Sequence, residues 1–161
     1  MFNKLEFCTK NQGNKMKNII SSVLVASTLL IPTLSSASQA KGLNVLVNSG
    51  ESQTQAMAMV LSLMTIKKHK KEVNIVLCGK AGDLADKNIK GTPTKRPNGK
   101  APSAKMHLKM LIKLGAHVEV CPLYLPNSGK DKSILLDGIT VAKPPVVAGK
   151  LLNTDYQNIT F

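Results

Sequence analysis

Two cysteines, Cys78 and Cys121, each stand where an apolar run with the character of a β-strand ends. Cys121 closes the run HVEVC and is followed by Pro122, which has no backbone N–H and cannot continue the hydrogen-bond ladder of a strand. A thiol at the end of a rigid strand becomes a nucleophile where its pKa falls below the usual value of about 8.5. We therefore take Cys121 as the candidate nucleophile, with an inert buried cysteine as the alternative.

Other catalytic motifs are not met in the sequence. The stretch CPLY, residues 121–124, lacks the second cysteine of a C-P-x-C redox pair, and Asn127 stands where a C-x5-R phosphatase loop needs arginine. A flavin phosphate cradle at residues 48–54 is not favoured, because the charge of Glu51 would oppose a phosphate. The three histidines are isolated in the sequence. We therefore predict no metal site and no cofactor.

The elements that must position the two thiols alternate between strands and helices. Strand-like runs cover residues 43–48, 72–78, 117–121, 139–142 and 158–161, and helical patterns cover residues 56–71, 104–115 and 130–138 and the segment that begins at 144. Residues 91–103, rich in Gly, Pro and Lys, read as a surface loop. Buried strands that alternate with helices predict an α/β fold, here a flavodoxin-like three-layer sandwich with a five-stranded, mainly parallel sheet.

The spacing of apolar residues predicts which helix faces are buried. The first helix is expected to bury the set Ala56, Met59, Val60, Leu63 and Met64, while Met57 and Leu61 widen its apolar arc so that it could be covered on a second side. The next long helix is expected to begin after the N-cap Ser103 and to end at Gly115. It should bury Ala104, Leu108 and Leu111 and present a cationic outer stripe of Lys105, Lys109 and Lys113.

The thiols are expected to share one rim with the turn that follows the first strand. Ligands bind at the carboxyl ends of parallel strands, which would bring Asn48 and Gly50 of that turn to the rim. In the flavodoxin-like order the second and third strands flank the first, so Cys78 and Cys121 would lie roughly 10 Å apart. A disulfide needs Cα atoms about 5.5 Å apart, so we expect none in that order. If the second and third strands were neighbours instead, a disulfide between the two cysteines would be expected.

The first forty residues have the composition of a secretory signal peptide. Lysines precede an uncharged apolar stretch at residues 19–36, and small residues lead up to Ala40; Met16 could be the true start. We expect an extension and signal peptide over residues 1–40, cleavage near Ala40, and a periplasmic domain over residues 41–161. An uncleaved membrane anchor is less favoured because a proline interrupts the short apolar stretch, so no stable membrane insertion is expected after cleavage.

The domain that remains would be basic and would keep two cysteines. Residues 1–40 contain Cys8, four lysines and one glutamate, so the formal net charge falls from +13 for the whole chain to +10. This balance favours anionic partners. Nucleic acid is not expected, because an exported protein rarely meets it and aromatic side chains for base stacking are scarce.

Five short motifs follow one another between residues 43 and 161: LNVLVNSG, VNIVLCGKAGDLA, LKMLIKLGAHVEVC, LLDGITVAKPP and NITF. In this order and spacing they resemble the DsrE-like family of sulfur-relay proteins, and VEVCPLYLPN resembles an exported branch of that family. The resemblance implies a flavodoxin-like domain, usually a homotrimer or homohexamer, and a persulfide carried on the cysteine of the third strand, Cys121. The family also includes members that lack this cysteine and act without sulfur transfer.

The predicted function is that of a periplasmic sulfur carrier that resembles a sulfurtransferase. Cys121 would accept sulfane sulfur from a small donor or a protein persulfide, while Lys80 and rim N–H groups would hold an anionic donor. Cys78 could resolve the persulfide if a loop brought it close. The alternative from another class is a non-catalytic oligomeric binding protein of the envelope with structural cysteines, and a weaker one is a soft-metal site formed by the two cysteines and a methionine.

Overall fold

The structure, a computed structural model, describes residues 39–96 and 98–161 of the 161-residue chain. The predicted signal peptide lies outside the described residues apart from Gln39 and Ala40, so it stays a prediction. In the part of the chain that the structure describes, no helix combines the length and the hydropathy needed to cross a membrane.

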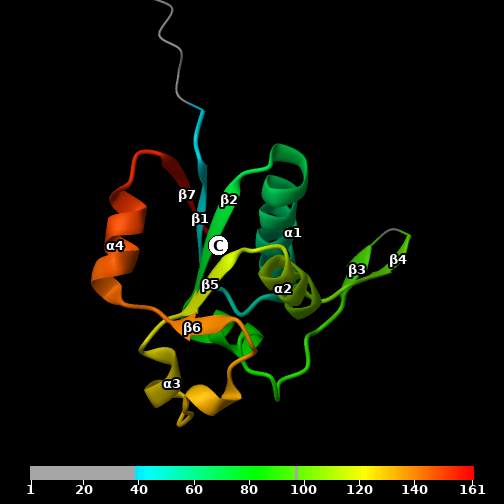
Figure 1. Cartoon of the computed structure of the whole chain (residues 1–161). Helices are drawn as coiled ribbons and strands as arrows, with labels where there is room; N and C mark the ends of the chain where they lie inside the picture. Colours follow the sequence, from blue (N-terminus) through cyan, green and yellow to red (C-terminus); the bar gives the residue numbers. More distant parts are fainter. Residues whose placement is uncertain (1–38, 97) are drawn as a thin grey trace, which may run out of the picture. The chain divides into compact units, whose positions relative to one another are not determined.

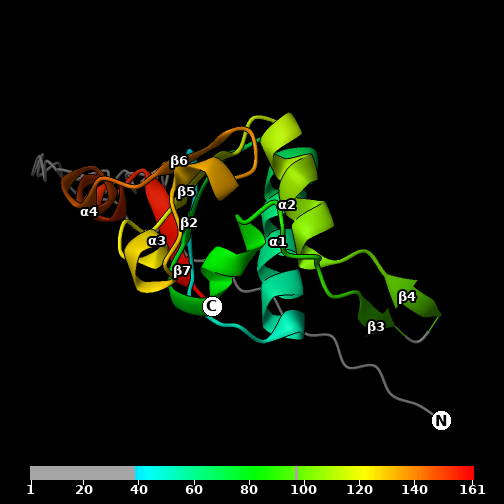
Figure 2. The same cartoon turned by 90° about the horizontal axis from the view of Figure 1, so that it is seen from below.

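Five parallel strands form one sheet in the order β6-β5-β2-β1-β7 (Figure 1). The strands are Gly42–Val47 (β1), Glu72–Leu77 (β2), His117–Val120 (β5), Ile139–Val141 (β6) and Tyr156–Thr160 (β7). The predicted α/β fold with a five-stranded parallel sheet is therefore confirmed. The predicted loop at residues 91–103 instead contains an antiparallel hairpin, Thr94–Arg96 (β3) and Gly99–Ala101 (β4), which extends away from the sheet in both views (Figures 1 and 2).

Helices cover both faces of the sheet and make three layers (Figures 1 and 2). One face carries α1 (Ser52–His69) and α2 (Ala104–Lys113), and the other carries α4 (Pro144–Leu152). The short α3 (Tyr124–Asn127) and two 3-10 helices, η1 (Gly79–Leu84) and η2 (Lys132–Ile134), lie at the carboxyl ends of the strands. The prediction of a helix over residues 130–138 was wrong, because only the 3-10 helix η2 forms in that segment.

The strand order differs from the one assumed for the two thiols. Strand β2 lies between β1 and β5, so the second and third strands of the sheet are neighbours instead of flanking the first. The physical reason is the handedness of the crossovers. Because α1 and α2 pack on the same face, two right-handed β-α-β crossovers advance the sheet twice in the same direction, and α4 on the opposite face brings β7 back beside β1.

The cap of α2 agrees with the prediction from the sequence, whereas the buried face of α1 does not. Ser103 accepts a hydrogen bond from the backbone N–H of Met106 and caps α2 as predicted, and Ala104, Leu108 and Leu111 are buried. On α1 the predicted face is rotated: Met59 and Leu63 are buried as expected, but the other buried positions are Gln55, Ala58 and Ser62. Apolar residues surround most of α1, so their spacing alone does not determine which side meets the sheet.

Lys105 is not part of an outer cationic stripe. Its side chain is only 6% exposed, and its ammonium donates hydrogen bonds to the backbone carbonyls of Asp86 and Ile89. Lys109 and Lys113 are exposed as predicted. A long aliphatic stem lets a lysine cross an apolar layer and reach polar atoms beyond it, which spacing on a helix cannot reveal.

The face of the sheet under α4 is held by polar contacts. The Asn44 side chain accepts a hydrogen bond from Asn74 at 2.9 Å and donates to Asn158 at 2.9 Å and to the carbonyl of Lys150 at 2.7 Å. The Lys150 ammonium pairs with the buried Glu119 carboxylate at 2.9 Å. These contacts dock α4, none of whose residues is fully buried.

Candidate functional site

The two thiols lie side by side at the carboxyl ends of adjacent strands. Leu77 of β2 is the register partner of Val120 of β5, and the Cys121 N–H donates to the carbonyl of Leu77 at 2.8 Å, so Cys78 and Cys121 form the next pair along the ladder. Neighbouring strands are about 4.8 Å apart, within the Cα separation that a disulfide spans. The separation of roughly 10 Å expected from the sequence was therefore wrong. In the structure both cysteines are free and half-buried.

The two sulfur atoms are not equivalent. Burial, the hydrogen bond with the Cys121 thiol and the repulsion of a second negative charge at that position raise the pKa of the Cys78 thiol to about 11. At neutral pH the Cys78 thiol is therefore protonated, and it is poorly suited to make the first nucleophilic attack.

The Cys121 side chain lines a pocket of about 440 Å³. Its other lining residues come from η1 and from the segment that follows β5: Gly79, Lys80, Asp83, Leu123, Tyr124, Asn127 and Ser128. The Cys121 carbonyl accepts a hydrogen bond from the Tyr124 N–H at 3.0 Å, which ties the CPLY turn to the end of the strand. Pro122 thus ends β5 as predicted, and the turn after it supplies an apolar wall beside the thiol.

A hydrogen-bonded network fixes the Tyr124 ring in that wall. Its hydroxyl donates to Asp83 at 2.8 Å and accepts from Lys130 at 3.3 Å, and the Lys130 ammonium is 5.6 Å from the ring centroid. Lys130 in turn pairs with the buried Asp86 at 2.8 Å. Burial and the hydrogen bond to Asp83 raise the pKa of Tyr124, so its hydroxyl stays neutral and keeps its proton as a donor.

Lys80, predicted to hold an anionic donor, lies at the pocket with its charge already paired. Its ammonium is 2.7 Å from the Asp83 carboxylate. Partial burial raises the pKa of Asp83, but hydrogen bonds from Lys80 and Tyr124 outweigh that effect and hold the pKa below its usual value. Asp83 is therefore ionised at neutral pH and offsets the positive charge of Lys80.

The remaining predicted residues, Asn48 and Gly50, lie on the same rim but do not line the Cys121 pocket. The Asn48 N–H donates to the carbonyl of Phe161 at 2.7 Å. A Cβ atom on Gly50 would come within 2.5 Å of the Lys80 side chain, so the absence of a side chain there lets the stem of Lys80 pack on the turn. The turn after β1 thus supports Lys80 instead of facing the thiol.

Several pocket residues had no assigned role in the sequence, among them Asp83, Asn127 and Ser128. Asp83 follows Lys80 by three positions, a spacing that brings side chains together on one helical turn and could have indicated the pair. Asn127 and Ser128 reach the pocket because the chain turns back after Pro122. Proline favours a turn at this position, but it does not indicate which later side chains will meet the thiol. Within the described residues, no three His, Cys, Asp or Glu side chains gather as a metal site.

No protein-family model matches the chain, and no curated protein matches it. Several solved structures are similar to it, among them the following two. MTH1491, a protein of unknown function from Methanobacterium thermoautotrophicum, is 11% identical with a TM-score of 0.55 over 74% of this chain and 98% of that one. The ychN protein from E. coli is 18% identical with a TM-score of 0.56 over 74% of this chain and 99% of that one. At such identities these likenesses concern the fold alone, and they support the predicted DsrE-like fold.

Proposed function

We propose that the protein is a sulfur carrier that accepts sulfane sulfur on Cys121 as a persulfide. The observation that carries this proposal is the position of the Cys121 thiol, half-buried at the end of a strand and open to a pocket of about 440 Å³. The thiolate attacks the sulfane sulfur of a donor R–S–SH, the S–S bond of the donor breaks, and R–S⁻ leaves while Cys121–S–SH forms. An acceptor thiol later removes the outer sulfur by the same type of exchange.

The walls of the pocket suit such a cargo. Sulfane sulfur is soft and weakly hydrated, and Leu123 and the Tyr124 ring supply apolar surface beside Cys121. Lys80 at the rim supplies a cationic group that attracts an anionic polysulfide or thiosulfonate donor. The ion pair with Asp83 weakens this electrostatic attraction.

Rapid trapping tests the assignment. The purified full-length protein is mixed with inorganic polysulfide, quenched at once with an alkylating reagent, digested and mapped by mass spectrometry. We expect an increase of about 32 Da, one sulfur atom, on the peptide that contains Cys121. Sulfur found only on Cys78, or on neither cysteine while both thiols stay reduced, contradicts the proposal.

The adjacency of the two thiols favours one alternative, a non-catalytic envelope protein with a structural disulfide. Secreted proteins commonly oxidise cysteine pairs at this separation. A thiol count on protein isolated without reductant separates the two functions. Two alkylatable thiols at positions 78 and 121 favour the carrier, and a disulfide that persists in mild thiol reductants favours the structural alternative.

Export to the periplasm is part of the proposal. Cell fractionation and sequencing of the mature N-terminus provide the test, with a start at Lys41 as the expected result. A mature protein that retains residues 1–40 in the cytoplasm contradicts it.

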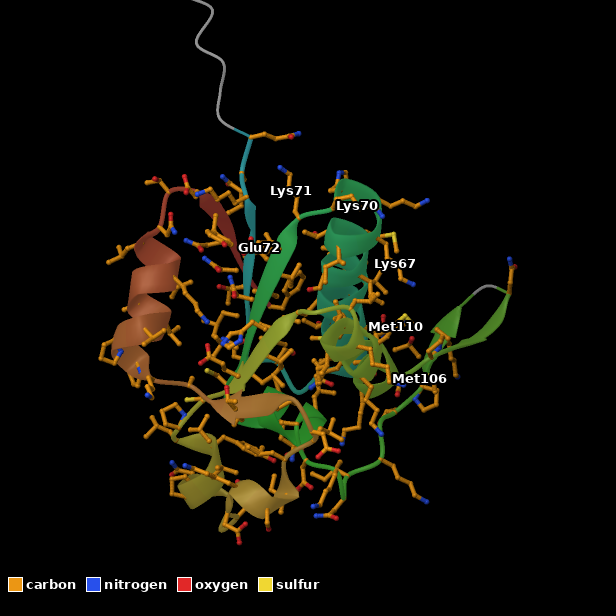
Figure 3. The ribbon with its side chains drawn as sticks, in the orientation of Figure 1. Lys67, Lys70, Lys71, Glu72, Met106 and Met110 are labelled. Carbon is orange, nitrogen blue, oxygen red and sulfur yellow. The ribbon has the colours of Figure 1, made fainter. Side chains whose placement is uncertain are left out.

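A homo-oligomer is the second part of the proposal, and an exposed apolar surface supports it. The methionine face, which we define as Met57, Leu61 and Met64 of α1 with Met106 and Met110 of α2, is solvent-exposed. Figure 3 shows Met106 and Met110 on the side of α2 that lies away from the sheet. Lys67 donates a hydrogen bond to the sulfur of Met110 at 3.4 Å across the two helices. Exposed apolar patches of this kind mark interaction surfaces.

A charge placed on the methionine face is expected to dissociate the oligomer. Met106 is 56% exposed in one chain, so Met106→Glu should leave the fold intact while it weakens subunit association by about tenfold or more. Sedimentation velocity over a range of concentrations measures the effect. The matched control is Leu152→Glu on α4, where the side chain is 82% exposed and lies outside this face. Identical assembly of both variants and the unmodified chain contradicts the assignment of the interface.

Removal of the negative charge of Asp83 beside Lys80 is expected to speed sulfur uptake from anionic donors. Asp83→Asn leaves Lys80 unpaired and keeps an oxygen that can accept the Tyr124 hydrogen bond. The rate of sulfur uptake from polysulfide at low ionic strength should rise by about two- to fivefold and return toward the original value at high salt. Asp137→Asn, which changes the net charge equally outside the Cys121 pocket, should have no such effect. Equal rates in the two variants indicate that Lys80 does not bind the donor.

A further inference from the structure

The two thiols meet without any movement of a loop. Cys78 and Cys121 follow the last register pair of two adjacent parallel strands, and the ionisation of each thiol depends on that of the other. Only Cys121 lines the pocket, so the pair has one outer and one inner thiol. A carrier that only hands on its sulfur needs no second cysteine at this position.

We propose that Cys78 is a resolving thiol that expels the sulfur bound on Cys121 as hydrogen sulfide and leaves a Cys78–Cys121 disulfide. This inference rests on the proposed function, because it takes the Cys121 persulfide as its starting point. It makes the protein a sulfane-sulfur reductase as well as a carrier.

The reaction balances within the protein. The Cys78 sulfur attacks the inner sulfur of Cys121–S–S⁻, the bond between the two sulfur atoms of the persulfide breaks, and the Cys78 proton leaves with the outer sulfur as HS⁻. The two cysteine sulfurs are oxidised by two electrons in total, and the sulfane sulfur is reduced to sulfide by the same two. No external oxidant is required. A dithiol or two monothiols must then reduce the disulfide before the next cycle.

The geometry selects the inner sulfur for attack. Cys78 lies beside the Cys121 sulfur itself, on the neighbouring strand, whereas the outer sulfur of a persulfide would project into the pocket that Cys121 lines. Attack at the outer sulfur would merely move the sulfane sulfur to Cys78, which does not line the pocket. Adjacent strand ends also provide the Cα separation that the product disulfide requires.

Protonation orders the two steps. The Cys78 pKa of about 11 prevents this thiol from competing for the donor at neutral pH, so Cys121 is loaded first. Because the Cys78 proton leaves with the outer sulfur, the protonated thiol and the ionised persulfide form the reactive pair, so sulfide release should stay nearly constant with pH while both forms persist below that pKa. Sulfur uptake by Cys121 does not depend on the ionisation of Cys78.

The test uses the full-length chain with Cys8→Ser, so that only the two paired cysteines can react. This background, its Cys78→Ser derivative and its Cys121→Ser derivative are loaded with inorganic polysulfide, desalted at once and followed by sulfide detection and intact mass. The background should release about one sulfide per chain without added reductant and become about 2 Da lighter than the reduced protein. The Cys78→Ser chain should keep an added mass of about 32 Da, and a Cys78→Ala chain repeats this result if serine perturbs the fold.

The outcomes separate this inference from the function on which it rests. A persulfide that lasts as long in the Cys8→Ser background as in the Cys78→Ser derivative overturns the resolving role, while the loading of both chains supports the carrier. If neither chain gains sulfur and the background forms no disulfide, the carrier function itself fails, and the resolving role with it.

Discussion

Cys121→Ser is expected to abolish sulfane-sulfur uptake, with a fall in rate of at least about a hundredfold. A serine hydroxyl is not ionised near neutral pH and is a poor nucleophile toward sulfur. Cys78 cannot replace the missing thiol, because its pKa of about 11 keeps it protonated and it does not line the donor pocket. The uptake rate is measured from the sulfur trapped per chain at short times after mixing with polysulfide.

The matched control is Cys78→Ser, which should take up sulfur at a rate close to that of the unmodified protein. Both substitutions exchange sulfur for oxygen at half-buried positions on adjacent strands, so their effects on folding should be similar. Equal melting temperatures, together with opposite effects on uptake, show that the loss is chemical. Uptake in Cys121→Ser at the rate of the control would remove Cys121 from the reaction.

Gly82→Ala is expected to destabilise the protein by about 1–3 kcal/mol, because a Cβ atom at this position overlaps a buried ring. That atom would lie only 2.3 Å from Cδ2 and 2.4 Å from Cγ of Tyr124. The ring is 7% exposed and its hydroxyl is bonded to Asp83, so it cannot retreat without losing that hydrogen bond or entering the pocket. Thermal unfolding should show a fall of several degrees in the midpoint, and sulfur uptake should slow as the pocket narrows.

Gly149→Ala provides the matched control for this substitution. Gly149 lies within α4, and a Cβ atom there would meet no atom within 4 Å. The free energy of unfolding should stay constant or rise by up to about 1 kcal/mol, because alanine favours a helix more than glycine does. Combining Gly82→Ala with Tyr124→Leu should cost less than the sum of the two single changes, since the smaller side chain relieves the overlap. Additive effects would contradict the overlap as the cause.

Some features of the fold follow from local sequence. The ends of β2 and β5 were predicted within one residue, because the apolar runs end there and Pro122 acts on the backbone at the position it occupies. The Ser103 cap follows from a hydrogen bond within its own helical turn. The assignment of Cys121 as the thiol at a strand end has the same local basis.

Other features depend on residues far apart in the chain. Asp83 and Tyr124 are 41 positions apart and meet through one hydrogen bond, so no pattern in either segment could predict their contact. Lys105 reads as a surface residue in its own helix, and it becomes buried because the carbonyls of Asp86 and Ile89 offer acceptors beneath it.

The sequence by itself determined the α/β class and the placing of a thiol at the ends of two strands, because apolar spacing, caps and prolines act within one element. Only the tertiary structure decided that these strands are neighbours. Strand order depends on which face each helix covers, and that choice is made by packing between elements rather than within them. The adjacency of Cys78 and Cys121, on which the resolving chemistry depends, is therefore a property of the assembled sheet.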